Sequence, residues 1–197
     1  IVKIYDMNTI EFEDMEINKY TSHTRAFVKI EDGCNNFCSY CIIPYVRGRV
    51  RSKEFNKVIE EVKYLVNNGH KEIVLTGIHT GQYHSEGKNL YDLLKELVKI
   101  NNLKRLRISS IEVVEINDDI ISLIKNEKIL VNHLHIPLQS GSDKILKLMN
   151  RRYDTKYFAD KIEKIRSARK DISITTDLIV GFNGEGEKEF IESYEFC

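Results

Sequence analysis

The sequence predicts an α/β fold, a partial barrel of parallel βα units, on the basis of two observations. From residue 25 onward, short runs rich in β-branched residues alternate with segments whose apolar residues recur at helical spacing. This alternation is typical of parallel βα units. In addition, the unusual polar motifs each stand at the carboxyl end of a predicted strand, where barrel folds build their active sites. A doubly wound sheet would instead gather its chemistry at one switch point.

Five segments are predicted to be strands because they are short and rich in β-branched residues. They are residues 25–31, 72–77, 104–109, 131–138 and 172–181. The polar motifs that follow or end these strands are residues 34–41, 76–82, 109–112, 135–142 and 177–181, in chain order. In a parallel barrel all five motifs lie at one mouth, so the sequence predicts a single site there.

Amphipathic helices are expected between the strands, because apolar residues recur every three or four positions. They are centred on residues 55–66, 90–98, 120–124, 145–149 and 157–165. Ser52 is the expected N-cap of the first helix, Gly69 is expected to close it, and Asn117 precedes the third.

Length and composition indicate an ordinary globular domain, with 197 residues, 42% hydrophobic and 30% charged. No apolar run approaches the roughly 18 residues of a membrane-spanning helix, and no signal peptide is visible. We therefore expect a cytoplasmic protein without a membrane partner, whose thiols stay reduced. Zero net charge argues against a polycation that binds nucleic acid over its whole surface. Cys197 is expected to be a buried helix residue.

The other three cysteines, Cys34, Cys38 and Cys41, lie within eight residues. Closely spaced thiolates can hold an iron–sulfur cluster, and three ligands for four irons leave one iron open for reaction. One alternative is a buried helical stripe, since the spacing is i, i+4, i+7. However, Gly33 and two asparagines disfavour a helix. The other alternative is zinc, because C-x-x-C is a common zinc spacing, although no further Cys or His follows before His70.

Residues 33–45, Gly-Cys-Asn-Asn-Phe-Cys-Ser-Tyr-Cys-Ile-Ile-Pro-Tyr, followed by Arg-Gly-Arg-Val-Arg-Ser at 47–52, resemble a radical S-adenosylmethionine (SAM) methylthiotransferase. The three cysteines alone resemble the wide radical SAM superfamily, and the flanking residues narrow the resemblance. His-Thr-Gly-Gln-Tyr at 79–83 is similar to the branch that modifies threonylcarbamoyladenosine in tRNA. The isopentenyladenosine tRNA branch, the ribosomal-protein branch and a non-catalytic metal-binding module stand as alternatives.

The resemblance implies a partial barrel of radical SAM type with six βα units. By this comparison the chain contains about five of the six and is truncated before the sixth strand. Residues 25–197 are then the radical SAM core domain, and residues 1–24 a linker from an N-terminal domain that the sequence lacks.

The resemblance also implies a [4Fe-4S] cluster on Cys34, Cys38 and Cys41, with SAM on the open iron. One electron, from a flavodoxin-like or similar reductant, then splits SAM to a deoxyadenosyl radical. The residues expected around SAM are Tyr40, Gly77, Glu112, Gln139, Arg152 and Asp177. Each also has a plain structural explanation, such as a tight turn at Gly77 or a hydrogen-bonded barrel residue at Asp177.

Basic residues crowd the segment after the cysteines, namely Arg47, Arg49, Arg51 and Lys53, with Tyr45 beside them. Basic residues next to an aromatic ring can hold backbone phosphates and stack a base. We expect this segment to contact phosphates of the tRNA anticodon loop. The alternative is a solvated loop whose arginine stems pack on the surface.

Overall fold

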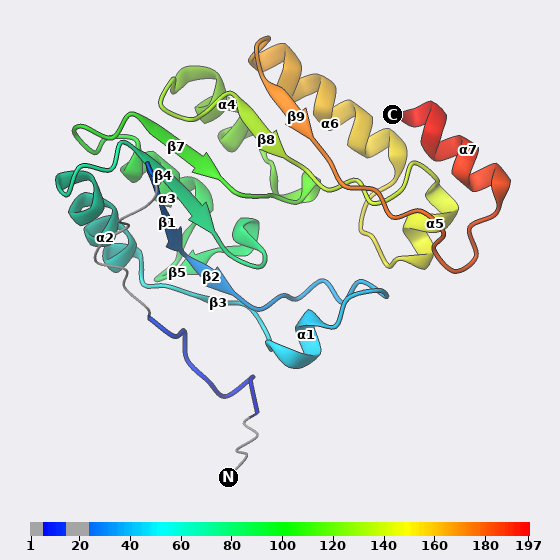
Figure 1. Cartoon of the computed structure of the whole chain (residues 1–197), viewed down its shortest axis with the longest axis horizontal. Helices are drawn as coiled ribbons and strands as arrows, with labels where there is room; N and C mark the ends of the chain where they lie inside the picture. The colour runs from blue at the N-terminus through cyan, green and yellow to red at the C-terminus, as the bar shows by residue number, and fades with distance from the viewer. Residues whose placement is uncertain (1–5, 15–23) are drawn as a thin grey trace.

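The computed structural model describes residues 6–14 and 24–197, and a curved layer of parallel strands forms its centre (Figure 1). The strands are β1 (Arg25–Lys29), β4 (Glu72–Thr76), β7 (Arg105–Ile108), β8 (His133–His135) and β9 (Ser173–Thr175). β1 pairs with β4, β4 with β7, and β8 with β9, all in parallel. The amide of Leu106 donates to the carbonyl of Ile129 (2.8 Å) and the amide of Val131 to the carbonyl of Leu106 (3.0 Å). These bonds join β7 to the segment before β8, so the predicted parallel βα order is confirmed.

Helices alternate with these strands as predicted, and two short hairpins are added. The helices are α1 (Ile43–Val46), α2 (Phe55–Asn67), α3 (Leu90–Leu97), α4 (Asp118–Asn126), α5 (Asp143–Leu148), α6 (Thr155–Ala168) and α7 (Glu187–Phe196). The hairpins pair β2 (Glu31–Asp32) with β3 (Arg51–Ser52), and β5 (His84–Ser85) with β6 (Lys88–Asn89). Single 3₁₀ turns span Thr80–Gln82 and Val113–Glu115.

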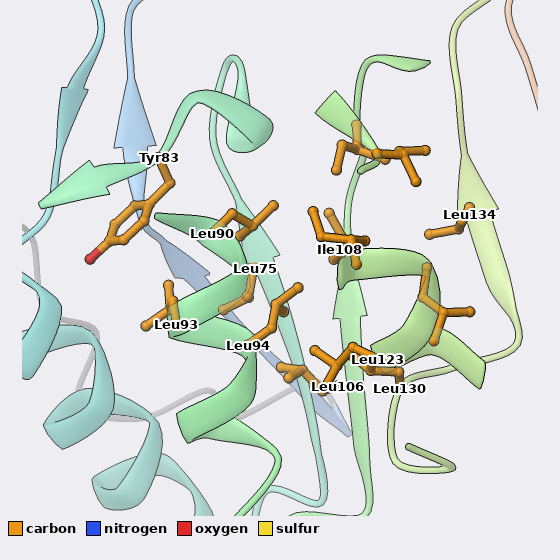
Figure 2. Packing of buried hydrophobic residues seen from close by; sticks show 14 of the residues in the cluster. Leu75, Tyr83, Leu90, Leu93, Leu94, Leu106, Ile108, Leu123, Leu130 and Leu134 are labelled. Atoms are coloured by element: carbon orange, nitrogen blue, oxygen red, sulfur yellow. The ribbon is translucent and has the colours of Figure 1, made fainter. Parts of the chain in front are cut away.

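The hydrophobic core lies between the strands and the helices that cover them. Alternate strand residues, including Leu75, Leu106 and Leu134, face the helices and are fully or nearly fully buried. Figure 2 shows Leu93 and Leu94 of α3 packed beside them. Burial of one such leucine side chain stabilises the fold by roughly 1.5–3 kcal/mol. The strands are thereby fixed in register, and with them the loops at their carboxyl ends.

The opposite face of the layer, the inner wall of the partial barrel, carries a row of polar contacts beside Phe27 and Val74. Arg107 Nε lies 3.1 Å from a Glu72 carboxylate oxygen, and Arg107 Nη1 lies 3.1 Å from His133 Nδ1. His133 Nε2 in turn lies 3.1 Å from the Thr175 hydroxyl. This chain of contacts crosses β4, β7, β8 and β9, and it satisfies polar groups on a face that is partly exposed.

Two of the three expected helix boundaries are confirmed. Gly69 follows α2 with φ of 101°, a conformation that favours glycine, and Asn117 caps α4 by accepting from the Ile120 amide (2.9 Å). The N-cap at Ser52 is wrong. Glu54 precedes α2, and Ser52 lies in β3, where its hydroxyl accepts from the His84 amide.

The prediction for Cys197 is also wrong, because its side chain is exposed after the last residue of α7. Only Glu189 and Ser193 of α7 are buried, so the end of the helix lies at the surface. The expected linker, residues 1–24, falls partly outside the described residues. Within residues 6–14 and 24–197, no helix is both long and apolar enough to cross a membrane.

Candidate cofactor site at the strand ends

The three clustered cysteines lie in a loop that follows β2 and contains no helix, so the buried helical stripe is wrong. Cys34, Cys38 and Cys41 are half-buried and line one cavity of about 210 Å³. Gly33 opens the loop with φ of 81°, and a Cβ there would lie 2.1 Å from the Arg49 carbonyl oxygen. Only glycine fits this close backbone crossing, which brings the beginning of the loop against the segment that follows it.

Residues that follow the ends of β4, β7 and β8, together with Arg151, complete the cavity. Its lining consists of the three cysteines with Asn36, Tyr40, Ile43, Ile78, His79, Ser110, Ile111, Glu112, Pro137, Gln139 and Arg151. Three of the six residues expected around SAM, Tyr40, Glu112 and Gln139, are therefore brought together with the thiols. A larger cavity of about 720 Å³, between α6 and the end of α7, contains none of the expected site residues.

The other three expected residues lie outside this lining. Gly77 directly precedes Ile78 at the rim. Asp177 is exposed, and a carboxylate oxygen lies 3.2 Å from His135 Nε2. Arg152 is exposed too, and it donates to the Asn35 carbonyl at 3.3 Å.

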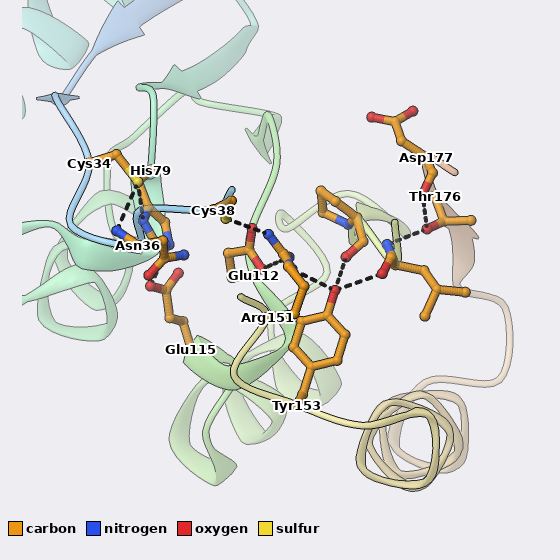
Figure 3. Close-up of polar contacts among 12 residues, drawn as sticks. Cys34, Asn36, Cys38, His79, Glu112, Glu115, Arg151, Tyr153, Thr176 and Asp177 are labelled. Atoms are coloured by element: carbon orange, nitrogen blue, oxygen red, sulfur yellow. Dashed lines mark hydrogen bonds and ion pairs between the residues drawn. The ribbon is translucent and has the colours of Figure 1, made fainter. Parts of the chain in front are cut away.

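Arg151, not Arg152, is the arginine that enters the cavity. Its side chain is 3% exposed, and Nη1 lies 3.3 Å from both Cys38 Sγ and the Tyr40 hydroxyl. Its Nη2 forms an ion pair with Glu112, and Figure 3 shows the guanidinium between the loop and that carboxylate. Burial raises the pKa of Glu112, against the opposing charge of Arg151. The left-handed turn at Asn150 (φ 58°) directs the chain so that Arg151 points inward.

His79 lies on the other side of the thiols and was missed by the sequence reasoning. Its Nδ1 lies 3.4 Å from Cys34 Sγ, and its Nε2 lies 2.6 Å from Glu115 Oε1 (Figure 3). Burial lowers the pKa of His79, but the contacts with Cys34 and with the Glu115 carboxylate outweigh it and raise that pKa to about 10. Two sulfurs thus have a cationic donor beside them, Cys34 with His79 and Cys38 with Arg151.

Glu31 supports the loop that carries His79. Its side chain is fully buried, and Oε2 accepts from the His79 amide at 2.6 Å. A Cβ at Gly77 would lie 2.7 Å from this same oxygen, so the strand end needs glycine there. Burial raises the pKa of Glu31 to about 7. A glutamate that ends a buried β run directly before the cysteine loop is the sequence signal that could have identified it.

The donor set fits an iron–sulfur cluster. A cubane binds each thiolate on a different iron, so the sulfurs need to face one cavity rather than one point. In the described residues, no three His, Cys, Asp or Glu side chains gather closely enough to hold a single metal ion. N–H donors near the sulfurs stabilise thiolates and an anionic cluster. The cavity therefore suits a cluster better than one zinc ion.

The basic segment after the cysteines is largely engaged within the protein. The prediction that Lys53 contacts RNA is wrong, because its side chain is 2% exposed and lies 2.5 Å from Asp14 and 2.9 Å from Glu61. Arg47 and Arg51 lie 2.7 and 3.6 Å from Asp32.

Arg49 differs from its three basic neighbours. Like Arg47 it is exposed, but its guanidinium lies over an aromatic ring, 4.3 Å from the centroid of Phe37. None of the carboxylates in residues 6–14 and 24–197 forms an ion pair with it.

Comparison with known proteins identifies relatives that agree with this site. The chain is 48% identical over 188 residues to the threonylcarbamoyladenosine tRNA methylthiotransferase MtaB of Bacillus subtilis (strain 168), covering 94% of this chain and 42% of that protein. It is 43% identical over 182 residues to the tRNA-2-methylthio-N(6)-dimethylallyladenosine synthase of Clostridium perfringens (strain SM101 / Type A), covering 89% of this chain and 40% of that protein. The chain thus spans less than half the length of these relatives. The resemblance to methylthiotransferases is confirmed.

The fold resembles that of the radical SAM methyltransferase TsrM from Kitasatospora setae, solved with cobalamin and a [4Fe-4S] cluster bound. The TM-score is 0.70 at 16% identity, covering 86% of this chain and 33% of that one. The predicted partial barrel of radical SAM type is therefore confirmed. The model of the radical SAM superfamily matches residues 28–197, from β1 through all the strand ends that line the cavity. The chain belongs to the radical SAM superfamily.

Proposed function

We propose that this chain is the SAM-cleaving core of a methylthiotransferase that modifies threonylcarbamoyladenosine beside the tRNA anticodon. The observation that carries the proposal is the set of three half-buried thiols that line one cavity with polar groups from the strand ends. The identity to the Bacillus subtilis relative, which bears this activity in its name, supports the substrate. The Clostridium perfringens relative, at 43% identity, makes a dimethylallyladenosine in tRNA the second candidate substrate.

In this proposal Cys34, Cys38 and Cys41 hold a [4Fe-4S] cluster. When bound, the cluster supplies the electron that cleaves SAM. Arg151 and His79 orient the cysteine loop by donating toward the sulfurs of Cys38 and Cys34. Both side chains also place positive charge beside the cluster, which helps to set the reduction potential of the cluster.

The chain's other cavity residues suit the polar and aromatic parts of SAM. Glu112 and Gln139 offer oxygen atoms to amino and hydroxyl groups, and Tyr40 offers a ring that is 38% exposed at the cavity. Gly77 keeps the backbone of the rim free of a side chain. Arg152 and Asp177 lie outside the cavity, so we assign them no contact with SAM.

The partners follow from the same proposal. The anticodon loop of a tRNA is the substrate, a one-electron reductant of flavodoxin-like kind supplies the electron, and the reaction takes place in the cytoplasm. Because Lys53 is buried, Arg49 is the residue of the basic segment that we expect to contact RNA. Arg47 and Arg51 add positive electrostatic potential near it. One carboxylate, Asp32, pairs with these two arginines and with Lys29, so positive charge remains.

Anaerobic reconstitution of the chain with iron and sulfide tests the proposal. We expect a [4Fe-4S] EPR signal in the reduced protein that changes when SAM is added. We also expect deoxyadenosine and methionine as products. Binding should be tighter to an RNA stem-loop that carries threonylcarbamoyladenosine than to one that carries dimethylallyladenosine. Stoichiometric zinc after anaerobic preparation, with no cluster spectrum, would show that the site is a metal-binding module instead.

A further inference from the structure

An exposed aromatic ring stands directly beside the cysteine loop. Tyr45 lies on α1, four residues after Cys41, and it is 72% exposed. Ile42, which directly precedes α1, and Val46 on α1 are 65% and 48% exposed. Apolar side chains gathered on the surface next to a cofactor cavity mark a binding surface more often than scattered ones do.

Among the described residues, the ring of Tyr45 is supported by Phe37. Phe37 meets it edge to face, with ring centroids 5.5 Å apart and an interplanar angle of 84°. Phe37 is itself fixed, because Arg49 lies against its ring and its carbonyl accepts from Asn150 Nδ2 at 3.0 Å. The Tyr45 ring is therefore held in place by the cysteine loop.

Arg49 adds a positive charge to this group. Arg47 and Arg51 share Asp32, whereas Arg49 is exposed and none of the described carboxylates pairs with it. An exposed aromatic face beside a cation that pairs with none of the described carboxylates matches single-stranded RNA, in which bases that stack alternate with phosphates. A protein partner would also cover the ring, but an exposed arginine without a carboxylate partner among the described residues favours a polyanion.

We propose that Tyr45, supported edge-on by Phe37, stacks on a nucleobase of an RNA loop while Arg49 binds an adjacent phosphate, an inference that rests on the proposed function and adds a contact for its substrate. Any base can stack on an aromatic face, so this surface binds the RNA loop without sequence specificity. Because Tyr45 closely follows the third cysteine, a base held there keeps the neighbouring nucleotides near the mouth of the cavity.

Titration of the reconstituted chain with an RNA stem-loop that carries 2-aminopurine in its loop tests the contact. Stacking on Tyr45 should quench the 2-aminopurine fluorescence in at least one loop position. Tyr45→Ala and Tyr45→Leu should weaken binding by roughly 5- to 150-fold, the equivalent of about 1–3 kcal/mol per stacked base. Tyr45→Phe should keep the affinity, since it keeps the aromatic face. Tyr64→Ala, at an exposed tyrosine of α2, is the matched control and should bind as wild type.

The salt dependence separates the roles of the two side chains. Arg49→Gln should reduce the slope of log affinity against log salt by about 0.7, as expected for one phosphate on a single strand. Tyr45→Leu should leave that slope unchanged while the affinity falls. An affinity and a fluorescence signal that do not change in Tyr45→Leu would overturn the inference and indicate that a protein covers the ring. SAM cleavage by the wild-type chain without RNA tests the proposed function separately, so either proposal can fail alone.

Discussion

Replacement of Asp32 by asparagine should destabilise the cysteine loop, because this carboxylate gathers three cations. Its side chain is 6% exposed, and its oxygens lie 2.7 Å from Lys29, 2.7 Å from Arg47 and 3.6 Å from Arg51. It also accepts from the Gly33 amide at 2.8 Å. The contacts with Gly33 and Arg47 tie the beginning of the loop to the end of α1, so the loss of charge acts on both sides of the cysteines.

The size of the effect follows from the pKa of Asp32. Burial alone would raise this pKa, but hydrogen bonds from Arg47 and Lys29 hold it at about 2, against a reference value of 3.8. A difference of nearly two units corresponds to about 2 kcal/mol of stability at neutral pH. Because the folded pKa is the lower one, this contribution is present above about pH 4 and is lost as the pH falls toward 2.

Urea unfolding of wild type and Asp32→Asn, followed by circular dichroism because the chain has no tryptophan, measures this contribution. The free energies of unfolding should differ by about 2 kcal/mol at pH 7 and converge toward pH 2. Asp160→Asn, at an exposed carboxylate paired with Lys156 on α6, is the control and should change stability little. Equal stability of Asp32→Asn and wild type at pH 7, or a difference that persists at low pH, would refute the reasoning.

Three further changes test the site. Cys38→Ala should abolish cluster binding, whereas Cys197→Ser, at an exposed thiol, should leave iron and sulfide per chain unchanged. Arg151→Met leaves the half-buried Glu112 without its ion-pair partner and should cost at most about 3–5 kcal/mol in urea unfolding, the cost of breaking a fully buried pair, whereas Arg152→Met, at an exposed side chain, should cost much less. Gly77→Ala places a Cβ 2.7 Å from the Glu31 carboxylate and should reduce deoxyadenosine formation. An unchanged rate would show that the backbone at this strand end can shift to accommodate the methyl group.

The order of strands and helices could be predicted from the sequence because apolar burial decides it. Leu75 and Leu106 on the strands and Leu94 on α3 are all buried in one core, and each belongs to a run with the period of its element. The boundaries were less predictable. Ser52 has the residue type of an N-cap, but the pairing of β3 with β2 takes it out of the helix. A local preference of about 1 kcal/mol is easily overridden by strand pairing.

Of the candidate site, the cysteine motif could be predicted from the sequence, whereas the residues around it were only partly predictable. The three cysteines lie within eight residues of sequence, so one loop brings them together and the tertiary fold is not needed to predict it. The choice between Arg151 and Arg152 depends instead on the left-handed turn at Asn150, which residue types alone do not reveal. His79 comes from a different strand end, and its approach to Cys34 exists only because the strands are parallel neighbours.

The basic segment shows how one motif can serve the loop and its ligand at the same time. Arg51 Nη1 lies 2.7 Å from the Arg47 carbonyl, and the amide of Cys34 donates to the Gly48 carbonyl at 3.2 Å. These contacts hold the segment against the cysteine loop. Arg47 and Arg51 therefore mainly stabilise the loop that carries the cysteines. Arg49 packs on Phe37 and pairs with none of the described carboxylates, so it is the arginine of the segment that can face a ligand. A count of basic residues therefore overstates the RNA contacts of this segment, and the charge left exposed after the internal pairs are removed is the better guide to its affinity and salt dependence.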